Sequence, residues 1–351
     1  MSEFSTVPSA ASLALLPCLD SEFGRKMYAR GRILAHERDV LPQHLIWDAD
    51  EVLWSWALAA KLSPLELARL MRHGDVTHRE AIQITPGLLE FILGVCDVAR
   101  ERGHDARMRI WTNGYAWRLW AVGQHVPGLF GMLGLAPDAR PQDVERSPVV
   151  FCRADYVRAI EPLLDHTKRM QWEAQQNWRL RDLMRAHMDL DPFDSNFKIP
   201  ELARLVGKGG FDDARILIDD QLKNATRFAR TGRKAVHVLS YPVRAAGQFS
   251  NVAWTLHDDL FEGHVTAIAE SIVEGIEALQ FAETGKVLKA SSRVQPHGYT
   301  PVRFELEIPD ARIREQWLKP MDDLKSKHLS TLQRWRRRAA RLRRGIRPPG
   351  S

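Results

Sequence analysis

The chain alternates between short apolar runs and segments whose apolar residues recur at helical spacing. Runs of strand length cover about residues 43–48, 107–112, 148–152, 214–219 and 235–239. Segments with helical periodicity follow them, the clearest at residues 88–100 and 222–230. Continuously apolar strands are typical of sheets buried on both faces, so the pattern predicts an α/β fold with a parallel sheet covered by helices on both sides.

The predicted elements divide the chain into three parts. Residues 1–40 form an N-terminal arm or helix packed on the domain, and residues 41–245 form a Rossmann-like core. Within the core, residues 153–197 are long, helical in pattern and rich in Gln, Arg and Trp, which predicts a helical insertion. Residues 246–351 form a C-terminal extension that includes an amphipathic helix at 267–279 and an alternating strand at 302–308.

The extension ends in a predicted basic helix at residues 322–347, whose last turns carry arginine nearly all round. Such a surface cannot be buried as a core helix. It favours contact with the phosphate backbone of a nucleic acid, attachment to an acidic partner or membrane surface, or a solvated tail. The sequence leaves these three interpretations open.

Composition narrows the class of protein. The 351 residues, 44% of them hydrophobic, suffice for a sizeable core. No apolar run has the length needed to span a bilayer, and the short apolar stretch at 10–18 follows no basic region, so we expect neither a membrane span nor a signal peptide. The cysteines Cys18, Cys96 and Cys152 lack the paired spacing of a zinc site or disulfide framework, which favours a cytoplasmic setting.

Polar residues stand where the predicted strands end. Asp48 and Asp50 follow the first strand one residue apart, and alternation places them on the same side of the chain. Thr112, Asn113 and Gly114 follow the second, where a hydroxyl and the start of a helix can bind an anion. The simpler interpretations are a solvated acidic turn and an ordinary Asn-Gly turn.

The fourth strand also ends in two acids, Asp219 and Asp220, and Lys198 stands just before a helix. The carboxyl ends of parallel strands lie along one edge of the sheet, so these groups are expected to meet there. Carboxylates, a lysine and a hydroxyl suit a hard divalent cation with an anionic ligand. Oxygen ligands favour Mg²⁺, which keeps several waters and bridges to phosphate.

The chain resembles the haloacid-dehalogenase-like (HAD) superfamily of hydrolases in four motifs that occur in order: Asp48-x-Asp50-x-Val52, Thr112-Asn113-Gly114, Lys198 and Asp219-Asp220. Thr85-Pro86-Gly87 also resembles the loop and helix start that commonly precede the second motif. The resemblance covers about residues 43–240. It implies a phosphohydrolase that forms an aspartyl-phosphate and depends on Mg²⁺.

The resemblance also implies a role for each matching residue. Asp48 is the expected nucleophile, and Asp50 the expected acid and base, with its carbonyl on the metal. Thr112 and the N–H of Asn113 are expected to hold the phosphoryl oxygens, and Lys198 to neutralise charge there. Asp219 and Asp220 complete the metal site, and which of them binds Mg²⁺ directly stays open.

The match to the superfamily has some departures. Glu51 occupies a position that is often Gly or Asn, and Val52 replaces the commoner Thr. Lys198 is preferred to Lys208 because of its Lys-x-Pro context. Asp50 favours phosphate chemistry, because members that act on carbon–halogen bonds usually lack an acid there.

The substrate is not fixed by the motifs. The insertion at 153–197 stands where a substrate-selecting cap is usual, whereas residues 51–85 are too few for a large cap. Tryptophans and arginines of the insertion either face the site or pack and stay solvated; they are Trp172, Trp178, Arg179, Arg181 and Arg185. The histidines share no metal-ligand spacing, and Cys152 is expected to be a core or rim thiol.

The leading expectation is a Mg²⁺-dependent phosphatase acting on a phosphomonoester of unknown identity. The alternative is a nucleic-acid-associated binding or assembly protein that uses the core as a scaffold, with polynucleotide ends as the substrate if it acts on one. The basic C-terminal helix separates the two, because its removal should weaken binding to DNA or RNA only in the second case.

Overall fold

A computed structural model of the chain describes residues 16, 19, 21–58, 79–112, 114, 116–164, 198–239, 264–266, 268–291, 294–296 and 302–307. The chain divides into two units, Met1–Tyr156 with Ser195–Ile308, and Val157–Asp194 with Pro309–Ser351. The first unit holds both the sheets and the candidate site. Of the second, the described part is the later portion of one helix, α8 (Arg153–Leu164).

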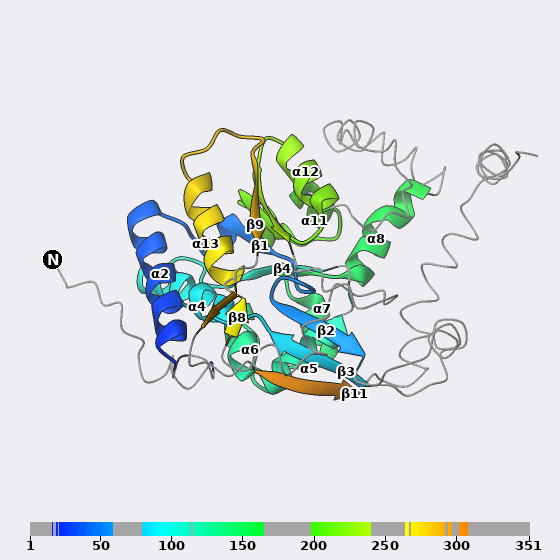
Figure 1. The fold of residues 1–351 in the computed structure, drawn as a ribbon. Coiled ribbons are helices and arrows are strands. Elements are labelled where there is room, and N and C mark those ends of the chain that lie inside the picture. Colours follow the sequence, from blue (N-terminus) through cyan, green and yellow to red (C-terminus); the bar gives the residue numbers. More distant parts are fainter. Residues whose placement is uncertain are drawn as a thin grey trace, which may run out of the picture. The chain divides into compact units, whose positions relative to one another are not determined.

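A parallel six-stranded sheet forms the centre of the first unit (Figure 1). Its order is β5-β4-β1-β6-β7-β9, and each neighbouring pair is parallel. The strands are β1 (Leu45–Trp47), β4 (Arg109–Trp111), β5 (Val150–Phe151), β6 (Ile216–Asp219), β7 (Lys234–Leu239) and β9 (Val287–Ser291). The predicted parallel α/β fold is therefore confirmed. The sequence pattern did not reveal β9, whose residues are less buried than those of the inner strands.

Successive side chains of a strand point to opposite faces of the sheet, and those of the inner strands are buried on both faces. Helices therefore cover both faces. On one face, Trp47 contacts Phe91 of α4 (Leu88–Glu101) edge to face at 6.3 Å. On the other, Trp111 stacks on Phe151 at 3.9 Å and meets Phe211 edge-on at 5.3 Å. Trp47 and Trp111 thus pack between the sheet and its helices.

The remaining helices connect the strands in chain order. The segment after β4 forms α5 (Ala116–His125), α6 (Pro127–Leu133) and α7 (Pro141–Arg146). After the insertion come α11 (Pro200–Leu205), the short 3₁₀ turn η3 (Gly209–Phe211) and α12 (Leu222–Arg230), and α13 (Ile268–Leu279) precedes β9. A further 3₁₀ turn, η2 (Pro42–His44), leads into β1. The predicted helices at 88–100, 222–230 and 267–279 are confirmed.

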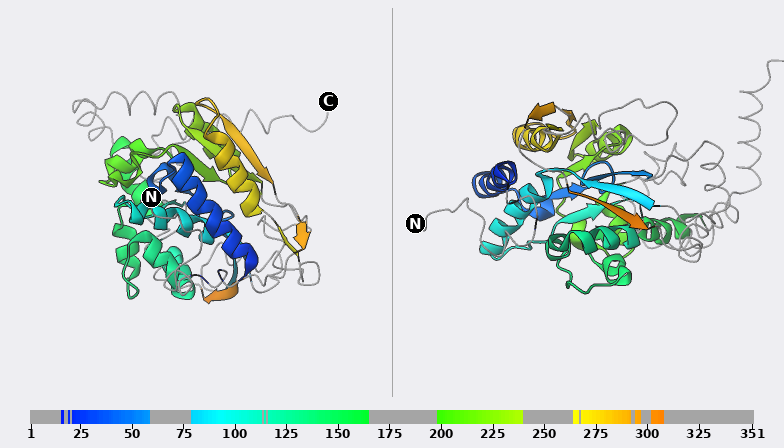
Figure 2. Two further views of the ribbon diagram at one scale, coloured as in Figure 1. Left: turned by 90° about the vertical axis from the view of Figure 1, so that its left-hand side faces the viewer. Right: turned by 60° about the horizontal axis from the view of Figure 1, so that its bottom comes forward.

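The N-terminal segment forms a helix, α2 (Glu22–Arg38), that lies against α4. The two backbones approach closely at paired glycines, because a Cβ atom on Gly31 would meet the carbonyl oxygen of Phe91, and one on Gly94 that of Tyr28. Lys26 and Arg30 pair with Glu270 and Glu277 of α13, which lies beside α2 in Figure 2. Residues 22–38 therefore pack against α4 and α13 of the first unit.

A second, antiparallel sheet of order β11-β3-β2 begins directly after the first acidic motif. It consists of β2 (Trp54–Leu58), β3 (Arg79–Ile84) and β11 (Arg303–Glu307). The apolar residues from Trp56 onward have a spacing that predicts one or two short helices, and for residues 56–58 this prediction is wrong, because they belong to β2. The five residues of β2 are too few to distinguish the helical period of 3.6 residues from the strand period of two. Their pairing with β3 makes them a strand. The predicted strand at 302–308 corresponds to β11.

Several predictions fall on residues outside the described set. They are Asn113, residues 165–197 of the predicted insertion, and the whole of the predicted basic helix at 322–347. A further two-stranded pair, β8 (His264–Thr266) and β10 (Val294–Pro296), completes the described elements. Among the described residues, no helix has the length and apolar character to cross a membrane.

Candidate functional site

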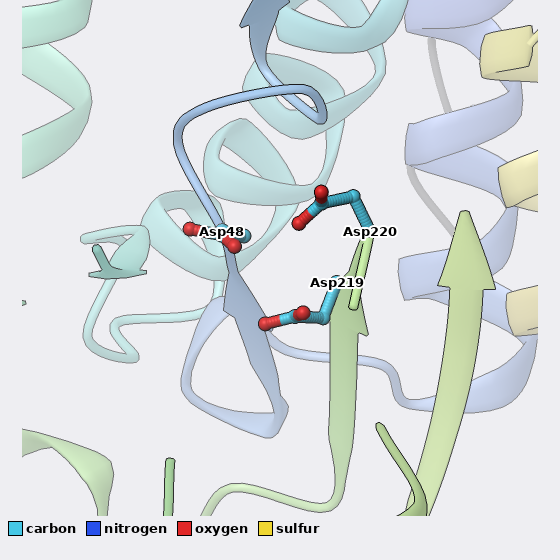
Figure 3. A group of neighbouring side chains, drawn as sticks. All are labelled: Asp48, Asp219 and Asp220. Carbon is cyan, nitrogen blue, oxygen red and sulfur yellow. The ribbon is translucent and has the colours of Figure 1, made fainter. Parts of the chain in front are cut away.

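Three carboxylates converge at the carboxyl ends of β1 and β6 (Figure 3). Asp48 directly follows β1, Asp219 ends β6 and Asp220 comes next. The two strands are parallel neighbours, with Trp47 opposite Ile218, so their ends coincide. One oxygen from each acid lies within 4.8 Å of the others. Asp48 and Asp219 are buried and Asp220 is half-buried, so the cluster opens on the side of Asp220.

A single buried lysine contacts two of these acids. Lys198 Nζ lies 2.6 Å from Asp48 Oδ2 and 2.7 Å from Asp219 Oδ2. Lys198 stands two residues before Pro200, the first residue of α11. Lys208, the other candidate, instead pairs with the buried Asp155. The lysine that reaches the carboxylates is thus Lys198.

The cluster carries more negative than positive charge. Burial raises the pKa of Asp48 well above its usual value, which Lys198 opposes and the charges of Asp219 and Asp220 increase. Burial, with the charge of Asp219, raises the pKa of Asp220 to about 6. Burial alone would lower the pKa of Lys198, but Asp219 and Asp48 outweigh it and raise that pKa. The geometry therefore holds Lys198 charged while penalising further negative charge.

Asp219 and Asp220 differ in how many protein donors they accept. Asp219 Oδ1 accepts from the backbone N–H of Gln221, and Asn224 Nδ2 donates to both of its oxygens at 3.0 and 3.2 Å. Lys198 approaches the remaining side of Asp219. Asp220 accepts from the exposed side chain of Gln221. Both carboxylate oxygens of Asp219 are thus engaged by protein donors. Asp220 has fewer such contacts, which leaves its oxygens better able to bind a metal ion.

Asp50 lies beside the cluster and has partners of its own. Its Oδ1 accepts a hydrogen bond of 3.1 Å from the indole Nε1 of Trp54 and lies 3.4 Å from Arg118 Nη1. Its Oδ2 faces the turn after β4, where Thr112 Oγ1 accepts from the N–H of Gly114. The acid of the first motif and the hydroxyl of the second therefore border the same turn.

Backbone hydrogen bonds close the loop that carries Asp50. The N–H groups of Leu53 and Trp54 both donate to the carbonyl of Ala49, and the N–H of Glu51 donates to that of Trp54 at 2.7 Å. Thr85 secures the loop from outside, because its hydroxyl donates to the carbonyl of Val52 at 2.6 Å. The Thr85-Pro86-Gly87 segment thus braces the loop as well as starting α4.

Glu51, at the tip of this loop, has a left-handed φ of 63°. Burial raises its pKa to about 8, and the charges of Asp220 and Asp50 add to that rise while Arg118 opposes it. Non-glycine residues pay for such a backbone conformation in strain. With a pKa of about 8, Glu51 is mostly protonated at neutral pH, so it adds little negative charge to the site.

Some residues that shape the site carried no recognisable signal. Arg118 stands in the first turn of α5 and Asn224 in the first turn of α12, and helical spacing alone does not show which way they point. His237 is buried on β7, and its Nε2 lies 3.0 Å from the carbonyl oxygen of Asp220. The position of His237 opposite Asp219 in the sheet register is the feature that brings it there.

Other candidates have structural surroundings. Burial raises the pKa of Cys152 to about 12, and the residue is fully buried, which agrees with a core thiol. His44 is buried before β1, where its Nδ1 accepts from the N–H of Leu41. No histidine belongs to a cluster of possible metal ligands in the part of the chain that the structure describes.

Compared with protein-family models, curated proteins and solved structures, the chain matches none of them. The site must therefore be interpreted from its own geometry.

Proposed function

We propose that the protein is a Mg²⁺-dependent phosphatase of the HAD type, which hydrolyses a phosphomonoester through an aspartyl-phosphate on Asp48. The observation that supports this best is the convergence of Asp48, Asp219 and Asp220 around the buried Lys198. Asp50 and Thr112 border the next turn of the same sheet edge. A set of acids with one lysine suits an anionic ligand only when a further cation offsets their charge.

The donor set fits a hard divalent cation. Its possible ligands are carboxylate oxygens, which Mg²⁺ prefers, and one oxygen of each acid lies within 4.8 Å of the others. Asp48 and Asp220 would hold the ion directly, with the carbonyl of Asp50. Asp219, already saturated by Asn224, Gln221 and Lys198, would support them. When bound, Mg²⁺ would reduce the repulsion between Asp48 and an incoming phosphate.

In this proposal Asp48 attacks phosphorus. Its Oδ1 accepts from the N–H of Ala49 at 2.8 Å and its Oδ2 contacts Lys198, so its orientation is fixed from two sides. Lys198 neutralises the carboxylate as the phosphate approaches and then the charge that develops on the phosphoryl oxygens. The buried position of both groups strengthens these interactions, because little water screens them.

Asp50 and Thr112 have complementary roles in the same proposal. Asp50 gives a proton to the leaving oxygen and later takes one from the water that hydrolyses the aspartyl-phosphate. Thr112 Oγ1 accepts from the N–H of Gly114, and its own O–H would donate to a phosphoryl oxygen. The N–H of Asn113, outside the described residues, is the proposed second donor.

The proposed activity can be tested by measuring phosphate release from sugar phosphates, nucleotides and 3′- or 5′-phosphorylated oligonucleotides. We expect turnover of at least one member with Mg²⁺ and its loss with a chelator. The preferred member would give the substrate class. Absence of turnover from folded protein across the panel would contradict the proposal.

The two acids that end β6 should differ in their effect on metal binding. We expect Asp220→Asn to weaken Mg²⁺ binding by more than about 100-fold with little change in unfolding temperature, because its carboxylate has few protein partners. Asp219→Asn should weaken binding only about 10-fold, as for groups that support a ligand, and should lower the unfolding temperature more. Calorimetric titration with Mg²⁺ and thermal unfolding of both variants measure this, and the reverse order would exclude Asp220 as the direct ligand.

A further inference from the structure

In the part of the chain that the structure describes, side chains bind Asp50 through one of its oxygens, Oδ1. The two groups that contact it from the protein, Trp54 Nε1 at 3.1 Å and Arg118 Nη1 at 3.4 Å, both approach Oδ1. Both are donors, and neither can accept a hydrogen bond. Because both donors approach Oδ1, Oδ2 is the oxygen of Asp50 that is oriented to exchange a proton with a substrate.

Asp50 Oδ2 faces Gly114, in the turn after β4. A Cβ atom on Gly114 would lie 3.3 Å from Asp50 Oδ2 and 3.1 Å from Thr112 Oγ1, which is closer than ordinary van der Waals contact. Asp50 Oδ2 and Thr112 Oγ1 therefore both lie next to the position that a side chain at residue 114 would occupy. A proton on Oδ2 is therefore directed towards the position where Thr112 would hold a phosphoryl group.

Trp54 is well placed to fix this arrangement. Its side chain is 1% exposed, so the indole cannot swing into solvent. Its backbone is bound to the same loop, since its N–H donates to Ala49 and its carbonyl accepts from Glu51. Trp54 also starts β2, which pairs with β3. The donor to Asp50 is consequently anchored in the second sheet.

We propose that Trp54 is a positioning residue for general acid catalysis, which holds Asp50 so that Oδ2 delivers its proton to the leaving oxygen. This inference rests on the proposed phosphatase function. As Asp48 forms its bond to phosphorus, the bond between phosphorus and the leaving oxygen breaks. The leaving oxygen takes the proton from Oδ2, and Asp50 is left as a carboxylate whose Oδ1 is still bound by Trp54. Asp50 recovers a proton from the water that cleaves the aspartyl-phosphate.

The need for this proton depends on the leaving group, which provides the test. An alkoxide is a poor leaving group and needs the proton, whereas p-nitrophenolate leaves without one. The ratio kcat/KM covers the steps up to the first irreversible one, and therefore includes departure of this group. Trp54→Phe should lower kcat/KM for an alkyl phosphate by about 10- to 100-fold, a part of the roughly 10²- to 10⁴-fold that general acid catalysis contributes, and change that for p-nitrophenyl phosphate by less than about 3-fold.

Trp120→Phe provides a matched control. Trp120 also makes one indole hydrogen bond, but to the carbonyl of Ala139, away from the acids. Its substitution should affect both substrates equally and slightly. If Trp54→Phe fails to fold, the sulfur analogue of tryptophan (benzothienylalanine) at position 54 keeps the ring shape and removes only the N–H, and the same selective loss is expected.

A double-mutant cycle gives a second readout. In an Asp50→Asn background, Trp54→Phe should cause no further selective loss, because the proton it positions is gone. Equal loss on both substrates, or no loss on either, would overturn the role of Trp54 while leaving the phosphatase proposal standing. Absence of Mg²⁺-dependent turnover by the parent protein would overturn both.

Discussion

Replacing Asp48 with asparagine will reduce Mg²⁺-dependent phosphate release by at least about 1,000-fold, the scale of loss when a covalent nucleophile is removed. The amide has almost the same shape as the carboxylate but is far less nucleophilic. The fold should survive, because burial and the charges of Asp219 and Asp220 raise the pKa of Asp48 and so already disfavour its charged form. Phosphate release and thermal unfolding of the same preparation measure the two effects.

The control for this variant is Asp97→Asn. Asp97 is another buried carboxylate, but it lies on α4, where it accepts from the hydroxyl of Tyr28 at 2.7 Å. Its substitution should lower stability and leave the activity of the folded protein within about 3-fold of the parent, as expected for a site remote from the chemistry. An Asp48→Asn protein that kept a tenth of the parent rate would show that Asp48 is not the nucleophile.

Replacing Lys198 with methionine should have the largest effect on stability. The variant leaves Asp48 and Asp219 facing each other without the cation that lies between them, and breaking a buried ion pair in this way costs about 3–5 kcal/mol. Turnover should fall by about 100- to 1,000-fold, because the charge on the transferring phosphoryl group loses its partner. Urea unfolding and phosphate release measure these losses.

Added Mg²⁺ should distinguish loss of charge at the acid cluster from a general loss of stability. We expect it to raise the unfolding temperature of Lys198→Met more than that of the parent, since a ligand that binds the folded state stabilises it and the variant has more uncompensated charge. Lys208→Met is the matched control: Lys208 is also buried, and it pairs with Asp155 outside the acid cluster. A similar response of both variants to Mg²⁺ would contradict binding at the cluster.

The central sheet could be predicted because its inner strands are short, apolar throughout and buried on both faces. Once such strands are parallel, their carboxyl ends share an edge, so the proximity of Asp48, Asp219 and Asp220 follows from topology. Topology alone does not show which lysine contacts these acids. Lys198 and Lys208 flank the same helix, α11, and the structure directs one to the acids and the other to Asp155.

The parts that sequence reasoning missed depend on pairing between distant segments. β11 is joined to β3, and the apolar residues from Trp54 become a strand because β3 lies beside them. The contacts of Trp54 and Arg118 with Asp50 follow from a loop closed by backbone hydrogen bonds, which no residue pattern reveals. Local periodicity determines elements, whereas non-local pairing determines which side chains meet.

The central position of β1 has a consequence for how the protein is made. β1 is paired on one side with β4, which follows soon after it, and on the other with β6, which is synthesised much later. While the ribosome has released only the segment up to β5, Asp48 has neither Lys198 nor Asp219 as a neighbour. Closing such a distant parallel pair is slow, because chain entropy is lost before the contacts form. The nascent chain therefore emerges with a half-built sheet whose open edge is β1 itself, the position where chaperone protection would matter most.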